Sequence, residues 1–191
     1  MPDRRRAALL VVDMLNPYDH EDAEALADSA AAVVEPLARL IAQASEAGSG
    51  VELVYVNDNL GDFAATRDDL VRRALDGTRP ELVEPLAPPR GVPFLQKIRH
   101  SVFYGTALDH WLRAQELDTL ILTGQVTEQC ILYSALDAYL RHYDVCVVRD
   151  AVAAIDPQLG DAALRMMERN MRARLVEAER CLDELRAGSR R

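Results

Sequence analysis

The sequence predicts an α/β protein with three layers, in which helices cover both faces of a Rossmann-like, doubly wound, six-stranded parallel sheet. Two observations predict this fold. Short β-branched apolar runs alternate with longer stretches of helical period along the chain. Most of the short runs are apolar on both faces, which is typical of strands buried between two layers of helices.

Six runs are expected to form the strands, because each is short, rich in branched residues and bounded by turn formers. The run at 173–176 is the weakest of them. In chain order the predicted strands are Ala7 to Val12, Val51 to Val56, Pro93 to Gln96, Thr119 to Thr123, Val145 to Val148 and Ala173 to Val176.

Six longer segments repeat their apolar residues with a helical period. Five of them connect one strand to the next, as the crossovers of a parallel sheet require, and the sixth follows the last strand. In chain order the predicted helices are Glu24 to Glu46, Thr66 to Asp76, Thr106 to Gln115, Cys130 to His142, Asp161 to Arg172 and Glu179 to Arg186.

Length and charge limit the class of protein. A chain of 191 residues, 49% hydrophobic and without a Pro/Gly-rich or charged linker, predicts a single domain over residues 1–191. A formal charge of −9 argues against nucleic acid as a partner, because nucleic-acid affinity depends on Lys and Arg neutralising phosphates. A small molecule is the expected partner.

The sequence also indicates a compartment. Basic residues do precede the first apolar run, but that run is short and ends at Asp13 without a small-residue cleavage site. No apolar stretch approaches the length that crosses a bilayer, so no membrane partner is expected. Three cysteines in a chain of this length do not form a disulfide framework. These features predict a cytoplasmic protein.

Three reactive residues follow predicted strands. Asp13, Lys97 and Cys130 come at or just after the ends of the first, third and fourth strands. Carboxyl ends of parallel strands share one edge, where ligands bind in such folds, so these residues are expected to converge. Taken alone, Asp13 is a common turn residue, Lys97 a surface group and Cys130 a core residue. Together they predict a site, because a buried lysine and a buried carboxylate compensate each other.

Cys130 is the candidate nucleophile. A helical pattern begins near it after a glycine, so its thiol is expected at a helix N-terminus. Unpaired amides and the helix dipole there favour the thiolate, which predicts a lowered pKa. Cys146, inside a strand, and Cys181, in the last helix, are expected to be inert core residues.

Several segments in order along the chain resemble the isochorismatase-like cysteine hydrolases. The nucleophile segment and the ends of the first three strands carry most of the resemblance, which extends from about Ala7 to Ile155. The matching segments are Val11-Val12-Asp13-Met14, Tyr55-Val56-Asn57-Asp58-Asn59, Lys97 with Ser101-Val102-Phe103-Tyr104-Gly105-Thr106, Gly124-Gln125-Val126-Thr127-Glu128-Gln129-Cys130-Ile131 and Arg149-Asp150-Ala151-Val152.

The resemblance implies a catalytic triad of Asp13, Lys97 and Cys130. Asp13 takes the thiol proton and later activates water, Lys97 holds the charges, and Cys130 attacks a carbonyl carbon. It also implies a non-proline cis peptide between Gln125 and Val126, and an oxyanion hole formed by the backbone N–H groups of Val126 and Cys130. The implied activity is hydrolysis of a C–N bond in an amide or ureido compound, through a thioester.

Departures from the family patterns narrow this expectation. The nicotinamidase branch has a metal site that begins Asp-x-His, whereas Asp58-Asn59-Leu60 here lacks the histidine. No catalytic metal and no other cofactor are therefore expected. The vinyl-ether-cleaving isochorismatases depend chiefly on the aspartate and can lack the cysteine, so the presence of Cys130 favours C–N hydrolysis and leaves vinyl-ether cleavage as the alternative.

Two further alternatives are a thiol-redox protein and a non-catalytic binding protein on the same fold. A thiol-redox protein needs a resolving cysteine, and a non-catalytic binding protein would keep the fold without turnover.

Members of the family commonly assemble, so a homo-oligomer, a dimer or larger, is expected. The polar or aromatic residues expected to line the substrate pocket are Asn16, Tyr18, Asn57, Asn59, Phe63 and Tyr104.

Overall fold

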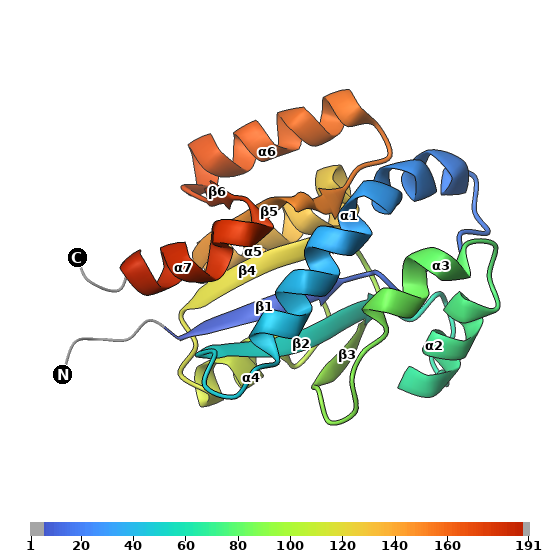
Figure 1. Cartoon of the computed structure of the whole chain (residues 1–191), viewed down its shortest axis with the longest axis horizontal. Helices are drawn as coiled ribbons and strands as arrows, with labels where there is room; N and C mark the ends of the chain where they lie inside the picture. The colour runs from blue at the N-terminus through green and yellow to red at the C-terminus, as the bar shows by residue number, and fades with distance from the viewer. Residues whose placement is uncertain (1–5, 189–191) are drawn as a thin grey trace.

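The computed structural model describes residues 6–188, and its strands form one six-stranded sheet in the order β3-β2-β1-β4-β5-β6 (Figure 1). All neighbouring strands are parallel. This is the predicted α/β fold. The strands are β1 (Ala7–Val12), β2 (Val51–Asp58), β3 (Phe94–Lys97), β4 (Thr119–Gln125), β5 (Asp144–Ala153) and β6 (Arg174–Val176).

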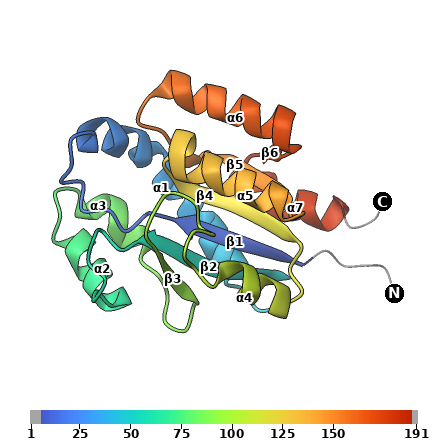
Figure 2. The same cartoon turned by 180° about the vertical axis from the view of Figure 1, so that it is seen from behind.

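Helices cover both faces of the sheet. The face seen in Figure 1 is covered by α1 (Ala23–Ala44) and α7 (Ala178–Gly188), with α2 (Arg67–Leu75), α3 (Pro80–Val83) and the short η1 (Glu84–Leu86) toward β3. The opposite face is covered by α4 (Leu108–Ala114), α5 (Leu132–Leu140) and α6 (Pro157–Met171), as Figure 2 shows. Among the described residues, no helix is both long enough and apolar enough to cross a bilayer.

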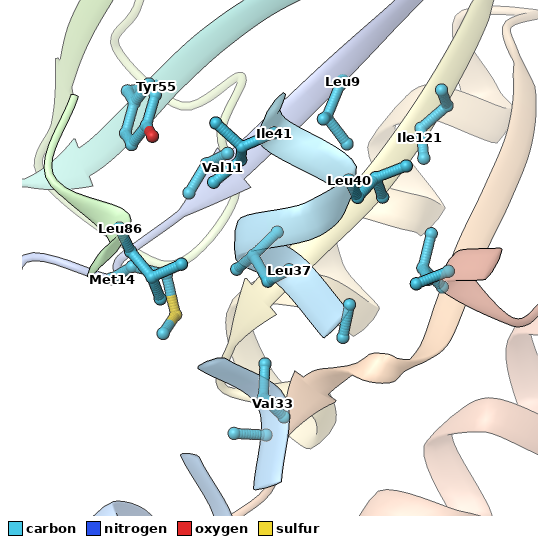
Figure 3. Packing of buried hydrophobic residues seen from close by; sticks show 14 of the residues in the cluster. Leu9, Val11, Met14, Val33, Leu37, Leu40, Ile41, Tyr55, Leu86 and Ile121 are labelled. Carbon is cyan, nitrogen blue, oxygen red and sulfur yellow. The ribbon is translucent and has the colours of Figure 1, made fainter. Parts of the chain in front are cut away.

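The core consists of two clusters, one on each face of the sheet. Side chains of β1 alternate between them: Leu9 and Val11 point into one cluster, and Leu10 and Val12 into the other. In the first cluster, residues of α1 such as Leu37 and Leu40 lie against β1 and β4 (Figure 3). Both faces of the sheet are buried under helices, which explains why the strands are continuous apolar runs.

The later strands are added on both sides of β1, and this arrangement creates the site. It first builds β2 and β3 on one side of β1 and later places β4, β5 and β6 on the other. Strand order therefore reverses between β1 and β4, and the crevice outside their carboxyl ends is where such sheets bind ligands.

Some element boundaries differ from the sequence prediction. Helix α3 and η1 were not predicted, and α6 begins at Pro157, where Asp156 caps two amides, rather than at Asp161. Strand β5 continues past Val148 to Ala153 through a register shift, because its polar residues find partners: Arg149 pairs with a glutamate, and Asp150 accepts a backbone hydrogen bond.

Candidate active site

Asp13, Lys97 and Cys130 lie together at the carboxyl edge of the sheet. Asp13 directly follows β1, Lys97 is the last residue of β3, and Cys130 lies in η2 (Thr127–Ile131), the turn after β4. The Nζ atom of Lys97 is 2.8 Å from Oδ2 of Asp13 and 3.6 Å from Sγ of Cys130. The lysine therefore contacts both of the other groups at once.

Asp13 is held by both neighbouring strands. Its φ of +54° is in the left-handed region, which aspartate tolerates better than most residues. Its amide donates to the carbonyl of Val56 at 3.0 Å, and its Oδ1 accepts from the amide of Asp58 at 2.7 Å. From β4, Nε2 of Gln125 donates to the carbonyl of Asp13 at 2.7 Å. One carboxylate oxygen is thus fixed by β2 while the other is directed at Lys97.

The environment makes Asp13 a stronger base than a free aspartate. Burial raises the pKa of its carboxyl above the usual value, although Lys97, Cys130 and the amide of Asp58 all act to lower it. A carboxylate with a raised pKa takes up a proton more readily at neutral pH.

Lys97 is buried, with 1% of its side chain exposed, and has a third neighbour in Asp58, whose Oδ2 is 3.5 Å from Nζ. Burial by itself lowers the pKa of a lysine, but Asp13, Cys130 and Asp58 raise that of Lys97 to about 12. The ammonium form therefore persists at neutral pH. Lys97 is also the single lysine in the sequence, a signal that by itself sets the residue apart.

The backbone of Cys130 is fixed by a π-helical turn at the start of α5. Such turns are rare and frequently occur at functional sites. The carbonyl of Cys130 accepts from Oγ of Ser134 at 2.5 Å, and that hydroxyl oxygen accepts from the amide of Val102 at 3.0 Å. The turn after β4 is thereby tied to the segment that follows β3.

The charge state of Cys130 corrects the expectation of a lowered thiol pKa. Burial, followed by the carboxylate of Asp13, raises the pKa of Cys130 to about 12. Lys97 and a hydrogen bond from the amide of Val126 act in the opposite direction and are outweighed. A second negative charge beside a buried carboxylate is too costly, so the resting residue is a thiol hydrogen-bonded to Asp13.

The turn that carries Cys130 depends on Gly124. Its φ is +106°, and a Cβ at this position would lie 2.0 Å from the carbonyl oxygen of Val12 on the neighbouring strand. The following peptide, between Gln125 and Val126, is cis, as the resemblance implies. Beyond it, the amide of Val126 faces the sulfur of Cys130.

A cavity of about 240 Å³ opens onto Asp13, Lys97 and Cys130. This volume is below the roughly 300–1,000 Å³ of sites for drug-sized ligands, so the cavity suits a small molecule. The other residues that line it are Leu15, Asn16, His20, Asp22, Leu26, Asn57, Asp58, Leu60, Gln125, Val126, Gln129 and Ile155.

Two of the six residues expected in the pocket, Asn16 and Asn57, line this cavity. The side-chain amide of Asn57 is hydrogen-bonded to the backbone of Leu15. Its Oδ1 accepts from the amide of Leu15 at 2.9 Å, and its Nδ2 donates to the carbonyl of Leu15 at 3.2 Å. It therefore holds the loop after Asp13 in place. The side chain of Asn16 also has protein partners: its Oδ1 accepts from the amide of Tyr18 at 2.8 Å, and its Nδ2 lies 3.3 Å from Nε2 of His20.

The other four expected pocket residues do not line the cavity. Tyr18 is buried beneath it and donates its hydroxyl to Oε1 of Gln125 at 3.2 Å. Asn59 is buried and accepts from the amide of Gly61. Phe63 and Tyr104 point into solvent, with 76% and 59% of their surface exposed. Proximity in sequence to Asp13, Lys97 or Cys130 was a poor guide, because these loops turn their side chains away from the cavity.

Several cavity residues were missed by the sequence prediction. Asp58 contacts Lys97 and ends β2, a position that marks it in the same way as Asp13. Asp22 and Gln129 line the cavity from helical turns, and no local pattern distinguishes them from other surface residues. His100 lies outside the cavity lining, yet its Nδ1 is 3.9 Å from Sγ of Cys130.

No group of three or more His, Cys, Asp or Glu side chains within residues 6–188 has an arrangement that could hold a metal ion.

Comparison with known proteins agrees with the fold. The isochorismatase domain model matches residues 7–180. The ureidoacrylate amidohydrolase RutB of Methylorubrum extorquens is 34% identical over 192 aligned residues, which cover 87% of this chain and 77% of the relative. The isochorismatase family protein YaaI of Bacillus subtilis is 29% identical over 177 residues, 93% of this chain and 97% of the relative.

Solved structures give the same result. The N-carbamoylsarcosine amidase of Thermoplasma acidophilum superimposes with a TM-score of 0.70 and 32% identity, over 91% of this chain and 97% of the amidase. The family model spans all six strands of the sheet and every residue that lines the cavity. The chain therefore belongs to the isochorismatase family of hydrolases.

Proposed function

We propose that this protein is a cysteine hydrolase that cleaves the C–N bond of a small amide or ureido compound through a thioester on Cys130. The observation that carries the proposal is the position of Lys97, whose ammonium contacts both Asp13 and Cys130 on the wall of one small cavity. Two similar proteins, the amidohydrolase RutB and N-carbamoylsarcosine amidase, are both enzymes that act on C–N bonds, and this similarity supports the proposal.

The first half of the reaction forms the thioester. Asp13 accepts the thiol proton as Sγ of Cys130 adds to the carbonyl carbon, and Lys97 balances the negative charge of the pair. We assign the amides of Val126 and Cys130 as the oxyanion hole; the direction of the Val126 amide, toward the sulfur, supports this assignment. The C–N bond then breaks, and the proton held by Asp13 passes to the leaving nitrogen.

The second half releases the acid. Water enters the site of the departed ammonia or amine, and Asp13 takes one of its protons while the oxygen attacks the thioester carbon. The C–S bond breaks, the thiol recovers the proton, and the cycle ends with the carboxylic or carbamic acid product. The raised pKa of Asp13 suits it to take up a proton twice in each cycle.

The cysteine arrangement disfavours thiol-redox chemistry at Cys130. The thiols of Cys146 and Cys181 are hydrogen-bonded to each other, and both residues are buried in the core. Of the three cysteines, all within the described residues, Cys130 is thus the one without a cysteine partner, which a resolving step needs.

The test is a panel of small amides, ureido compounds and isochorismate, incubated with the protein and with Cys130→Ala while ammonia and acid release are recorded. Ammonia release that disappears in Cys130→Ala is expected. Cys146→Ala, which removes a buried thiol elsewhere on the sheet, is the matched control and should retain activity. Isochorismate cleavage that survives Cys130→Ala would select the aspartate-driven vinyl-ether route instead, and ligand binding without turnover would select a binding protein.

A further inference from the structure

The cavity contains more negative than positive charge. Its lining includes three aspartates, Asp13, Asp22 and Asp58, whereas Lys97 is the one lining side chain with a permanent positive charge. Asp13 and Asp58 share Lys97 as a partner, at 2.8 Å and 3.5 Å, so the three carboxylates exceed the one cation by two charges. The protein as a whole adds to this field, with a formal charge of −9.

Lys97 is not available to an anionic ligand. Its side chain is 1% exposed, and its ammonium already has Asp13, Asp58 and Cys130 as neighbours. An ammonium has three N–H donors, so these contacts use its full capacity. A substrate carboxylate would have to displace one of these partners in order to reach it.

His20 and His100 are the histidines near the site. His20 lines the cavity, and Nδ2 of Asn16 lies 3.3 Å from its Nε2. His100 lies beyond the sulfur of Cys130, outside the cavity lining. The remaining polar side chains of the lining are neutral amides.

Asp22 blocks the place where an anion would otherwise be stabilised. The first turn of α1 borders the cavity through Asp22 and Leu26, and the N-terminus of a helix of 22 residues attracts negative charge. The Asp22 side chain makes no capping hydrogen bond, so its carboxylate is exposed beside the cavity instead of being used by the helix. The protein's own charge therefore occupies this position.

We propose that this cavity accepts small uncharged or cationic amides and ureido compounds and rejects those that carry a carboxylate near the cleaved bond. The proposal rests on the proposed function and narrows its substrate class. It sets the chain apart from relatives such as the ureidoacrylate amidohydrolase RutB and N-carbamoylsarcosine amidase, because ureidoacrylate and N-carbamoylsarcosine are acids. Isochorismate, a dianion, is disfavoured for the same reason.

Alkylation of Cys130 tests the charge preference without knowledge of the substrate. Iodoacetamide is neutral and iodoacetate is its anionic counterpart; in both, sulfur displaces iodide from carbon. Rates at the Cys130 peptide, measured by mass spectrometry and normalised to glutathione, are expected to favour iodoacetamide by about tenfold, since each unbalanced charge contributes roughly threefold at these distances. Raising the ionic strength should narrow the difference.

Variants of Asp22 make the test specific. Asp22→Asn should lower the normalised preference for iodoacetamide by about threefold, and Asp22→Lys should lower it further. Glu24→Gln is the matched control, because it removes one negative charge from the same helical turn outside the cavity lining, and it should change the preference little. A wild-type preference for iodoacetate, equal normalised rates, or an unchanged ratio in Asp22→Lys would overturn the proposal.

Turnover of a matched series then separates this proposal from the proposed function. Succinamate, its methyl ester and 4-aminobutanamide present the same primary amide with a negative, neutral or positive group. We expect ammonia release, as kcat/KM, to be about tenfold or more slower for succinamate than for the other two. Cys130-dependent turnover of all three at similar rates would overturn the charge selection and leave the hydrolase intact, whereas the alkylation preference stands whether or not these amides are hydrolysed.

Discussion

The side-chain amide of Gln125 donates to the backbone carbonyl of Asp13 at 2.7 Å, so the last residue of β4 fixes the residue that follows β1. Oε1 of the same side chain accepts from the hydroxyl of Tyr18 at 3.2 Å. The two hydrogen bonds form a chain that links the loop after β1 to the peptide preceding the nucleophile turn. Tyr18 thus acts on the site through Gln125, without touching the cavity.

Removal of the Tyr18 hydroxyl should therefore affect the position of Asp13 and Gln125 more than the binding of substrate. Tyr18→Phe leaves Oε1 of Gln125 without its donor, and we expect the free energy of unfolding to fall by about 1 kcal/mol. The value of kcat should decrease with little change in KM. Urea unfolding measures the free energy of unfolding, and steady-state kinetics measures kcat and KM. Tyr104→Phe, at an exposed tyrosine, should change neither; a large increase of KM in Tyr18→Phe would instead place the hydroxyl against the substrate.

The thiol of Cys130 should titrate far above the usual cysteine range. Because its pKa is raised to about 12, the rate of iodoacetamide alkylation at Cys130 should keep rising with pH and show no plateau below about pH 11. Asp13→Asn removes a carboxylate that raises this pKa and frees Lys97 to pair with the thiolate. The variant should therefore alkylate faster at neutral pH while turnover is lost.

The pH profiles of the wild type and Asp13→Asn are compared by mass spectrometry of the Cys130 peptide. A wild-type plateau near pH 8 or 9, or identical profiles for the two proteins, would contradict the assignment of Asp13 as the neighbour that keeps the thiol protonated.

Loss of Lys97 should be costly both for stability and for activity. Lys97→Met leaves Asp13 and Asp58 facing each other without a cation, and breaking such a buried pair costs about 3 kcal/mol of unfolding free energy. Turnover should fall at least about a hundredfold, because the negative charge formed during attack is no longer balanced.

A double variant isolates the cause of this effect. Asp13→Asn combined with Lys97→Met removes both members of the ion pair, so it should recover part of the stability lost in Lys97→Met and none of the activity. Additive stability losses in the double variant would show that the two side chains do not interact.

Stability should decrease in alkaline solution. The pKa of Cys130 rises from 9.0 to about 12 on folding, and that of Lys97 from 10.5 to about 12. Above pH 9 the unfolded chain loses protons that the native state retains, so the free energy of unfolding falls as pH rises, by up to about 1.4 kcal/mol per pH unit for each group. Urea unfolding at several pH values measures the slope. In Cys130→Ala the decline between pH 9 and 10.5 should be shallower; an equal slope would argue against the raised thiol pKa.

Gly124 should not tolerate a side chain. A Cβ there would meet the Val12 carbonyl oxygen at 2.0 Å, and the φ of +106° is unfavourable for alanine. We expect Gly124→Ala to lower the free energy of unfolding by at least about 3 kcal/mol. Gly48→Ala is the control, because Gly48 also has a positive φ but open space around it, and its cost should be about 1 kcal/mol. Similar costs at both glycines would show that the close approach to β1 is not limiting.

The sequence by itself determined the fold and the convergence of the three central residues. Apolar runs of strand length separated by helical periods require a parallel sheet, and the carboxyl ends of its strands share one edge. Asp13, Lys97 and Cys130 were identifiable because each comes at or just after the end of such a run. These conclusions depend on local patterns, which a single sequence displays directly.

The tertiary structure decided the charge state of the site and the composition of its cavity. The pKa of Cys130 depends on burial and on Asp13 and Lys97, which are distant in sequence. Burial and Asp13 raise this pKa and outweigh Lys97, whereas the local pattern suggested a lowered value. Loop geometry turned Phe63 and Tyr104 toward solvent, while Asp22 and Asp58 came to border the cavity. Electrostatic energies act through space between residues that only folding brings together, so no local pattern could reveal them.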